Sequence, residues 1–346
     1  MEEQKIRVGI TQGDINGVGY EVILKTFAEP MMCELCTPII YGSPKVAAYH
    51  RKALDLPTNF SIVPSASEAQ PNRLSIVNCS DDEVKVEFSK PSPEAGKAAL
   101  AALERALEEY KEGLIDVLVT APINKHTIHS EEFNFPGHTE YIEQKVGEGQ
   151  QALMILMKGD LRVALVTTHL PVSQIAQAIT QPLIEEKIAI FHRSLKVDFD
   201  ISAPRIAVLS LNPHAGDEGL LGSEEQEIIT PAIQAMRAKG ILCYGPYPAD
   251  GFMGSGNFSH FDGILAMYHD QGLAPFKALA MDEGVNFTAG LPIVRTSPAH
   301  GTAYDIAGKG VAVEDSFRQA VYTAIDVFRN RCQDKSRHAN PLRKQY

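Results

Sequence analysis

Residues 205–214 read RIAVLSLNPH, a short apolar run that ends in polar residues and a histidine. Two other stretches repeat this arrangement, RVALVTTH over residues 162–169 and GILAMYH over residues 263–269. A short apolar run bounded by polar or turn residues predicts a buried strand. Ligand sites of open α/β sheets lie beyond the carboxyl ends of their strands. We therefore expect the three histidines, His169, His214 and His269, to reach one edge of a sheet.

Three imidazoles at one sheet edge are a suitable ligand set for a divalent metal ion. Three protein ligands leave one coordination position open for a substrate, as in catalytic zinc sites, and imidazole also suits other transition metals. The alternative is three unrelated loop histidines, which is the simpler interpretation of any one of them alone. Their shared placement after apolar runs favours the metal.

Strand-like and helix-like segments alternate along the whole chain. Such alternation predicts an α/β protein with a mainly parallel, doubly wound sheet. Further strands are expected at residues 6–11, 38–42 and 116–120, and helices at 19–27, 45–53, 94–112, 183–195, 224–239 and 311–332. The polar tail after residue 332 is expected to be loose.

Bulk composition limits the classes of function. The chain has 346 residues, of which 44% are hydrophobic and 22% charged, and its net charge is −11. This length allows two α/β domains, and the acidic balance argues against a nucleic-acid-binding protein. The N-terminal residues lack the apolar region of a signal peptide, and no apolar stretch is long enough to span a membrane. Five scattered cysteines suit a reducing compartment, so we expect a cytoplasmic protein.

Two polar segments in the first half of the chain suggest anion binding. GDINGVG at residues 13–19 follows a strand and opens a helix, where backbone amides favour an anion, although a plain tight turn explains it equally well. In FPGHTE at residues 135–140, His138 would serve as an acid, a base or a phosphate donor, and Thr139 as a hydroxyl donor. The alternative is a helix capped by Thr139 beside an incidental histidine.

Three polar residues follow His269 within the next 26 positions. They are Lys277, Asn286 and Arg295. If they converge on one pocket they suit a phosphomonoester, because arginine binds phosphate in a bidentate manner. The alternative is solvated surface charge, the usual environment of a single lysine or arginine.

Nine segments together resemble the 4-hydroxythreonine-4-phosphate dehydrogenase (PdxA) family. They run in the order of that family from residue 13 to residue 310: GDINGVGYEVILK, VTAPINK, FPGHTEY, TTHLPV, LNPHAGDEG, PAD, YHDQGLAPFK, GVNFTAGLPIVRTS and HGTAYDIAGKG. The resemblance implies two α/β/α domains with mainly parallel sheets, similar to isocitrate and isopropylmalate dehydrogenases, with the active site in the interdomain cleft. The implied division is residues 1–135 with 300–346, and residues 136–299, which would carry the metal ligands and the dimer interface.

The resemblance also implies a role for each matching residue. The metal ligands are His169, His214 and His269, and the metal is zinc, magnesium, manganese or cobalt. The substrate is held by His138, Thr139, Lys277, Asn286 and Arg295. Proton transfer involves Asp250, Lys277 or His138. The NAD or NADP cofactor lies against the loop of His300, Gly301, Thr302, Ala303, Tyr304 and Asp305. Relatives are homodimers that share each metal site between two subunits.

Four positions depart from the family pattern. Ile15 and Asn16 replace a Pro-Ala pair, Tyr20 replaces a proline, and Gly251 stands where a threonine is frequent. These changes concern the rim of the implied site and leave the three histidines intact.

The implied reaction is oxidation and decarboxylation of 4-phosphohydroxy-L-threonine to 3-amino-2-oxopropyl phosphate, a step of pyridoxal 5'-phosphate biosynthesis. One alternative keeps the fold and changes the substrate to D-threonate or D-erythronate 4-phosphate, or to a dihydrodiol, which a phosphate pocket disfavours. An alternative of another class is a metal-dependent phosphohydrolase, and a third is a non-catalytic binding protein. A cofactor loop at residues 300–305 argues against the hydrolase.

Overall fold

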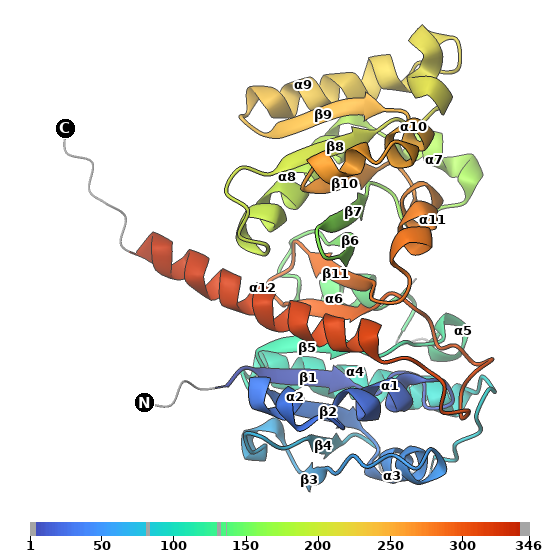
Figure 1. The fold of residues 1–346 in the computed structure, drawn as a ribbon, viewed down its shortest axis with the longest axis vertical. Helices are drawn as coiled ribbons and strands as arrows, with labels where there is room; N and C mark the ends of the chain where they lie inside the picture. The colour runs from blue at the N-terminus through green and yellow to red at the C-terminus, as the bar shows by residue number, and fades with distance from the viewer. Residues whose placement is uncertain (1–4, 81–83, 130–132, 136, 340–346) are drawn as a thin grey trace. The chain divides into compact units, whose positions relative to one another are not determined.

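The computed structural model describes residues 5–80, 84–129, 133–135 and 137–339 (Figure 1). The chain divides into two compact units. The first comprises residues 1–152, 282–287 and 291–325, and the second residues 153–281, 288–290 and 326–346. The sequence places the start of the second domain at residue 136, whereas residues 137–152 belong to the first unit in the structure.

The first unit contains a parallel sheet. Its strand order is β3-β4-β2-β1-β5-β12, followed by β11, and every pairing from β3 to β12 is parallel. The strands are β1 (Arg7–Thr11), β2 (Thr37–Gly42), β3 (Ser61–Val63), β4 (Ser75–Asn78), β5 (Val117–Thr120), β11 (Val285–Ala289) and β12 (Arg295–Pro298). The helices are α1 (Gly19–Thr26), α2 (Pro30–Leu35), α3 (Pro44–Ala53), η1 (Ala66–Glu68), α4 (Pro93–Lys111), α5 (Lys125–Ile128), α6 (His138–Val146) and the first part of α12 (Asp315–Ala339).

Helix α4 illustrates how the sequence builds this unit. It begins after Ser92, whose side chain accepts a hydrogen bond from the amide of Ala95, and Pro93 occupies the first turn. One face of the helix is apolar and packs into the core beside β2 and β1. The buried carboxylate of Glu109 is satisfied by the Tyr41 hydroxyl at 2.7 Å and by Arg105 at 2.7 Å.

The second unit contains the three strands predicted to end at histidines. Its order is β6-β7-β10-β8-β9, with β6 and β7 antiparallel and the other pairings parallel. The strands are β6 (Leu153–Lys158), β7 (Leu161–Leu165), β8 (Arg205–Leu209), β9 (Leu242–Tyr247) and β10 (Gly263–Ala266). The helices are α7 (Val172–Ala178), α8 (Gln181–Val197), η2 (Pro213–Gly219), η3 (Glu225–Ile229), α9 (Thr230–Ala238), α10 (Ala249–Gly254), η4 (Asn257–His260) and α11 (His269–Ala280).

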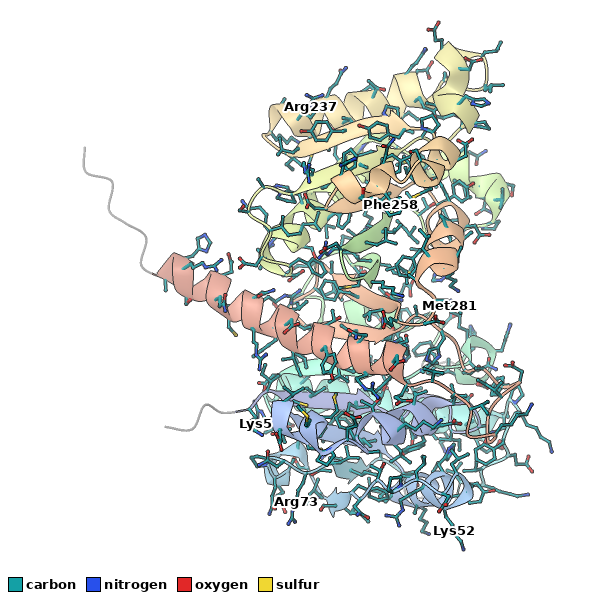
Figure 2. The ribbon with its side chains drawn as sticks, viewed as in Figure 1. Lys5, Lys52, Arg73, Arg237, Phe258 and Met281 are labelled. Carbon is teal, nitrogen blue, oxygen red and sulfur yellow. The ribbon has the colours of Figure 1, made fainter. Side chains whose placement is uncertain are left out.

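Helices α11 and α9 pack closely against the sheet of the second unit. Gly272, in the first turn of α11, lies so close to β7 that a Cβ there would meet the Leu165 side chain at 2.6 Å. At the outer edge lies Arg237 of α9, which is labelled in Figure 2. Its guanidinium is 5.5 Å from the centre of the Tyr244 ring of β9. Both contacts hold helices against the sheet whose strand ends carry the histidines.

The prediction of a mainly parallel α/β fold is confirmed, with two local differences. The closing helix continues past residue 332 to Ala339, where the tail was expected to be loose, and Arg337 pairs with Asp200 at 2.6 Å. The predicted helix at 224–239 is a π-helical turn, η3, followed by α9. In the described part of the chain, no helix is long and apolar enough to cross a membrane.

Candidate active site

Strands β7, β10 and β8 lie side by side, so the three histidines leave the sheet at adjacent strand ends. Strand β10 pairs with β7 and with β8 in parallel register. The ring centres of His169 and His269 are 5.9 Å apart. Two imidazoles that share one metal, each at about 2.1 Å from it, have ring centres roughly 5–6 Å apart. The separation of His169 and His269 therefore suits a common metal ion.

His214 lies in a backbone turn of unusual conformation. Five consecutive residues, from His214 to Glu218, have φ between +44° and +79°, which forms a left-handed turn. Only one of the five is a glycine, and each other residue costs roughly 1–2 kcal/mol in this conformation. The buried carboxylate of Glu225 supports the turn, because it accepts hydrogen bonds from the amides of Leu211 at 2.8 Å and Asn212 at 2.7 Å. Such strained backbone is typical of functional sites.

A cavity of about 490 Å³ lies beside these strand ends within the second unit. Its walls include His214 from η2, Asp250 from α10, and Tyr268, Asp270 and Gln271 around the start of α11. The cavity thus brings one predicted metal ligand together with Asp250, a predicted proton-transfer residue. Lys277, the other residue of the second unit considered for that role, is exposed on α11.

The structure brings two of the three predicted ligands together within one chain. Among the described residues, no group of three or more His, Cys, Asp or Glu side chains is placed to hold a metal ion. His269 has an orienting partner, because its Nδ1 lies 2.7 Å from the Asp270 carboxylate. A metal-bound histidine commonly has such a partner on its other ring nitrogen. The three-histidine site therefore remains a prediction for this chain.

The first unit holds a buried cationic cluster at the start of β12. The Arg295 guanidinium donates to the Thr120 hydroxyl at 2.6 Å through Nη2, and the same nitrogen lies 3.3 Å from Nδ1 of His138. Burial lowers the pKa of Arg295 to about 10, so it remains charged at neutral pH. Burial, followed by the charges of Arg295 and Lys125, lowers the pKa of His138 well below its usual value.

Arg295 and His138 are groups that would stabilise an anion placed beside them. His138 is uncharged at neutral pH, and its Nδ1 faces a donor, so its other nitrogen carries the proton. Arg295 supplies a fixed positive charge with a planar array of donors.

His138 begins helix α6 after Gly137, and no side chain of the described residues caps this helix, so the proposed capping role of Thr139 is wrong. Asn286, on β11, presents a buried Oδ1 with no hydrogen-bond partner among the described residues.

The predicted cofactor loop at residues 300–305 is docked on the loop that follows β1. The amide of Val18 donates to the carbonyl of Thr302 at 3.0 Å, and the Tyr304 hydroxyl donates to the Asp14 carboxylate at 2.6 Å. The side-chain amide of Asn124 donates to the Tyr304 hydroxyl at 3.1 Å. Within the loop, Nε2 of His300 is buried without a hydrogen-bond partner among the described groups, and burial lowers the pKa of this imidazole.

Three of the four departures from the family pattern lie in the first unit, where they make defined contacts. The side-chain amide of Asn16 donates to the carbonyl of Lys90 and its oxygen accepts from the amide of Glu87, both at 2.8 Å. The Tyr20 hydroxyl donates to the side-chain oxygen of Gln12 at 2.8 Å. The carbonyl of Ile15 lies 2.8 Å from Nε2 of the buried His50. These three positions therefore stabilise the loop after β1.

Several site residues were missed by the sequence analysis. Thr120 and Lys125 belong to VTAPINK, one of the segments that carry the family resemblance, so a signal for them was present. Glu225 gave no comparable signal, because its role depends on backbone amides of a turn that the sequence does not predict. The left-handed turn from His214 to Glu218 also has no local signature beyond Gly216.

We predict that Asp14→Asn changes how stability depends on pH. Burial raises the pKa of Asp14, so its ionised form is disfavoured in the folded state. A raised pKa means that stability falls as pH rises through the folded value. Asp14→Asn should therefore have a higher Tm than the parent protein near pH 8, and the gain should shrink toward pH 4. Thermal unfolding followed by circular dichroism at both pH values measures this, and an equal gain at both would contradict it.

Comparison with known proteins gives one consistent result. The model of the family described as "Pyridoxal phosphate biosynthetic protein PdxA" matches residues 34–324. A relative from Bacteroides thetaiotaomicron named 4-hydroxythreonine-4-phosphate dehydrogenase is 79% identical over 346 residues, which is all of this chain and 95% of the relative. A D-threonate 4-phosphate dehydrogenase from Cupriavidus necator is 39% identical, covering 91% of this chain and 95% of the relative.

A solved structure supports the same assignment. The 4-hydroxythreonine-4-phosphate dehydrogenase of Klebsiella pneumoniae superposes with a TM-score of 0.80 at 34% identity, covering 94% of this chain and all of that one. The family match and the two curated relatives cover most or all of the sequence, so the predicted resemblance is confirmed. This chain belongs to the PdxA family.

Proposed function

We propose that this protein oxidises and decarboxylates 4-phosphohydroxy-L-threonine to 3-amino-2-oxopropyl phosphate, using NAD or NADP and one divalent metal ion. The observation that carries the proposal is the 79% identity, over the whole chain, with a relative named 4-hydroxythreonine-4-phosphate dehydrogenase. The adjacent histidine-bearing strand ends and the buried Arg295 cluster support the same chemistry.

Three histidines, His169, His214 and His269, would hold the metal ion. Imidazole nitrogens suit zinc, cobalt and related ions, and the 5.9 Å separation of two of the rings fits a shared ion. When bound, the metal supplies Lewis acidity to the substrate hydroxyl and to the ketone that forms from it. Asp270 would hold the His269 ring so that Nε2 faces the metal.

The Arg295 cluster would bind the phosphate group of the substrate. Arg295 provides charge-assisted donors, and uncharged His138 adds an N–H from the ring nitrogen that does not face Arg295. Thr139, the residue after His138 on α6, would add a hydroxyl donor to these contacts. The unpartnered Oδ1 of Asn286 would accept a hydrogen bond from an ammonium or hydroxyl group of the substrate.

Proton transfer is assigned to Asp250 or Lys277. One of them takes the proton of the substrate hydroxyl while the hydride leaves with the nicotinamide, whose chemistry belongs to the cofactor. The bond to the carboxylate then breaks, and its electron pair stays on the carbon next to the new ketone. The same group, or the other of the two, returns a proton to that carbon. The loop at residues 300–305 would hold the adenosine side of the cofactor.

A second candidate substrate is D-threonate 4-phosphate. It carries a hydroxyl where 4-phosphohydroxy-L-threonine carries an amino group, and a relative named for it is 39% identical to this chain.

The two substrates and the hydrolase alternative are separated by one set of assays. Purified protein is given NAD, Mg²⁺ or Zn²⁺, and each of the two phosphorylated substrates in turn, and NADH is followed by absorbance. We expect kcat/KM to be at least about tenfold higher with 4-phosphohydroxy-L-threonine, because the site then contacts the amino group as well. A preference for D-threonate 4-phosphate would reassign the substrate, and release of inorganic phosphate without NADH would indicate the hydrolase.

We further propose that each metal site is shared by two copies of the chain. His169 and His269 lie together, whereas no third ligand joins them among the described residues. A histidine of the partner subunit would complete the site. The protein would then be an obligate homodimer for catalysis.

A subunit-mixing experiment tests the shared site. His169→Ala, His214→Ala and His269→Ala are each expected to be inactive, and the three variants are mixed in pairs. After subunit exchange between two variants whose histidines come from different subunits, one site of each mixed dimer carries both defects and the other carries neither, so activity should return for those pairs. Exchange is verified with two affinity tags. Verified exchange without any recovered activity would contradict the shared site.

A further inference from the structure

The side chain of Gln271 joins two of the strand ends that carry the histidines. Gln271 lies in the first turn of α11, two residues after His269. Its Oε1 accepts a hydrogen bond from the amide of Met267 at 2.7 Å, at the end of β10. Its Nε2 donates to the carbonyl of Ser210 at 2.6 Å, just past the end of β8. One amide group therefore spans β10 and β8.

The third strand end is joined to the same residue, Met267. The hydroxyl of Thr167, past the end of β7, donates to the carbonyl of Met267 at 2.8 Å, and the Thr167 amide donates to that carbonyl at 3.1 Å. The N–H of Met267 is bound by Gln271 and its C=O by Thr167. Thr167, Ser210 and Met267 are all buried. We call this set, Thr167, Met267, Gln271 and Ser210, the strand-end tie.

The tie lies where the regular sheet stops. Strand β8 ends at Leu209 with a register shift toward β9, and the Ser210 amide donates to the carbonyl of Tyr247 of that strand rather than to β10. Beyond the ends of β10 and β8, the backbone segments that lead to His269 and His214 are positioned by contacts other than strand pairing. A side chain that is hydrogen-bonded to both strand ends limits how far they move apart.

We propose that Gln271 is a positioning residue for the metal ligands. By tying the ends of β10 and β8 it fixes where His269 and His214 leave the sheet. It thereby sets the affinity of the protein for a divalent metal ion. This inference rests on the proposed metal-dependent function. Residues that orient metal ligands typically change metal affinity by about 10- to 100-fold when they are replaced.

The competing explanation is an ordinary helix cap. A side chain at the third helical position that reaches back to an amide before the helix resembles a capping box, which stabilises the helix alone. Gln271→Glu separates the two roles. Glutamate keeps an acceptor for the Met267 amide and suits a helix N-terminus, but it places a carboxylate oxygen against the Ser210 carbonyl, where no donor remains.

The test measures metal binding instead of turnover. Full-length protein is stripped of metal and titrated with Co²⁺, followed by its visible absorption, and with Zn²⁺ in competition with a chelator. The matched control is Gln234→Glu, which makes the same chemical change at an exposed position of α9. His269→Ala shows which part of the binding needs a histidine ligand.

We expect Gln271→Glu to weaken Co²⁺ and Zn²⁺ binding by about 10- to 100-fold and Gln234→Glu to leave it unchanged. Equal affinities in Gln271→Glu and the parent protein would overturn the tie while leaving the metal proposal intact. If the parent protein and His269→Ala bind Co²⁺ equally, the metal proposal falls, and the inference with it. If Gln271→Glu does not fold, Thr167→Val is used instead, because it removes the hydroxyl of the same tie. This variant should weaken metal binding by at least about threefold. An unchanged affinity in Thr167→Val would refute the role of the tie.

Discussion

Replacing His269 by alanine is expected to lower kcat by about a thousandfold or more and to remove the bound metal. His269 is within 5.9 Å of His169, ring centre to ring centre, and in the proposed site it is one of three protein ligands. Lewis-acid stabilisation by a metal is worth several kcal/mol, and each 1.36 kcal/mol is a factor of ten in rate. NADH formation and metal content per chain, measured on the same preparation, give the two values.

The control for this variant is His260→Ala. His260 is an exposed histidine of η4 in the same unit, and its replacement should change neither value. A His269→Ala protein that keeps both its metal and its turnover would show that this imidazole is not a ligand.

The second large effect is expected at Arg295. Arg295→Ala removes a buried guanidinium that lies beside Thr120 and His138, and a charge-assisted hydrogen bond is worth roughly 1.5–3 kcal/mol. The value of kcat/KM for the phosphorylated substrate should therefore fall by about 10- to 100-fold, mainly through KM. Any residual activity on the dephosphorylated substrate should change far less.

Arg295→Lys is the matched variant because it keeps the charge and removes the planar array of donors. An intermediate loss is expected for it. Thermal unfolding of both variants is needed, since Arg295 is buried and its removal also leaves space in the core. Equal losses on the phosphorylated and dephosphorylated substrates would show that Arg295 does not bind the phosphate.

The sequence was sufficient to predict the strands that carry the histidines, since their apolar runs are short and sharply bounded. It could not establish which of these strands are neighbours. In the chain they occur as β7, β8 and β10, whereas in the sheet β10 lies between the other two. That order is set by packing of helices such as α11 on the sheet, a long-range effect that no local pattern records.

The environment of Arg295 was also only partly predictable. Strand β12 begins at Arg295 itself and not in the apolar run before it, which places the guanidinium between β5 and the start of α6. A stretch of five or six residues does not by itself determine where strand pairing begins. The partners on β5 and α6 lie more than 150 residues away in sequence, as for Thr120 and His138.

The left-handed turn at His214 marks the limit of local sequence reasoning most clearly. Residues such as Ala215 and Asp217 rarely adopt positive φ, so their conformation is imposed by surrounding contacts, including those of Glu225 to the preceding backbone. A sequence pattern predicts the backbone conformations that residues prefer, whereas surrounding contacts hold the residues of this turn in conformations that they seldom adopt.

The most direct test of the central claim is the stoichiometry of the reaction with and without metal. Protein stripped by a chelator is incubated with 4-phosphohydroxy-L-threonine and NAD, then supplemented with Zn²⁺ or Mg²⁺, and NADH and CO₂ are measured together. The account predicts almost no turnover before supplementation and equal amounts of NADH and CO₂ after it. Full turnover of the stripped protein, or phosphate release without NADH, would contradict it.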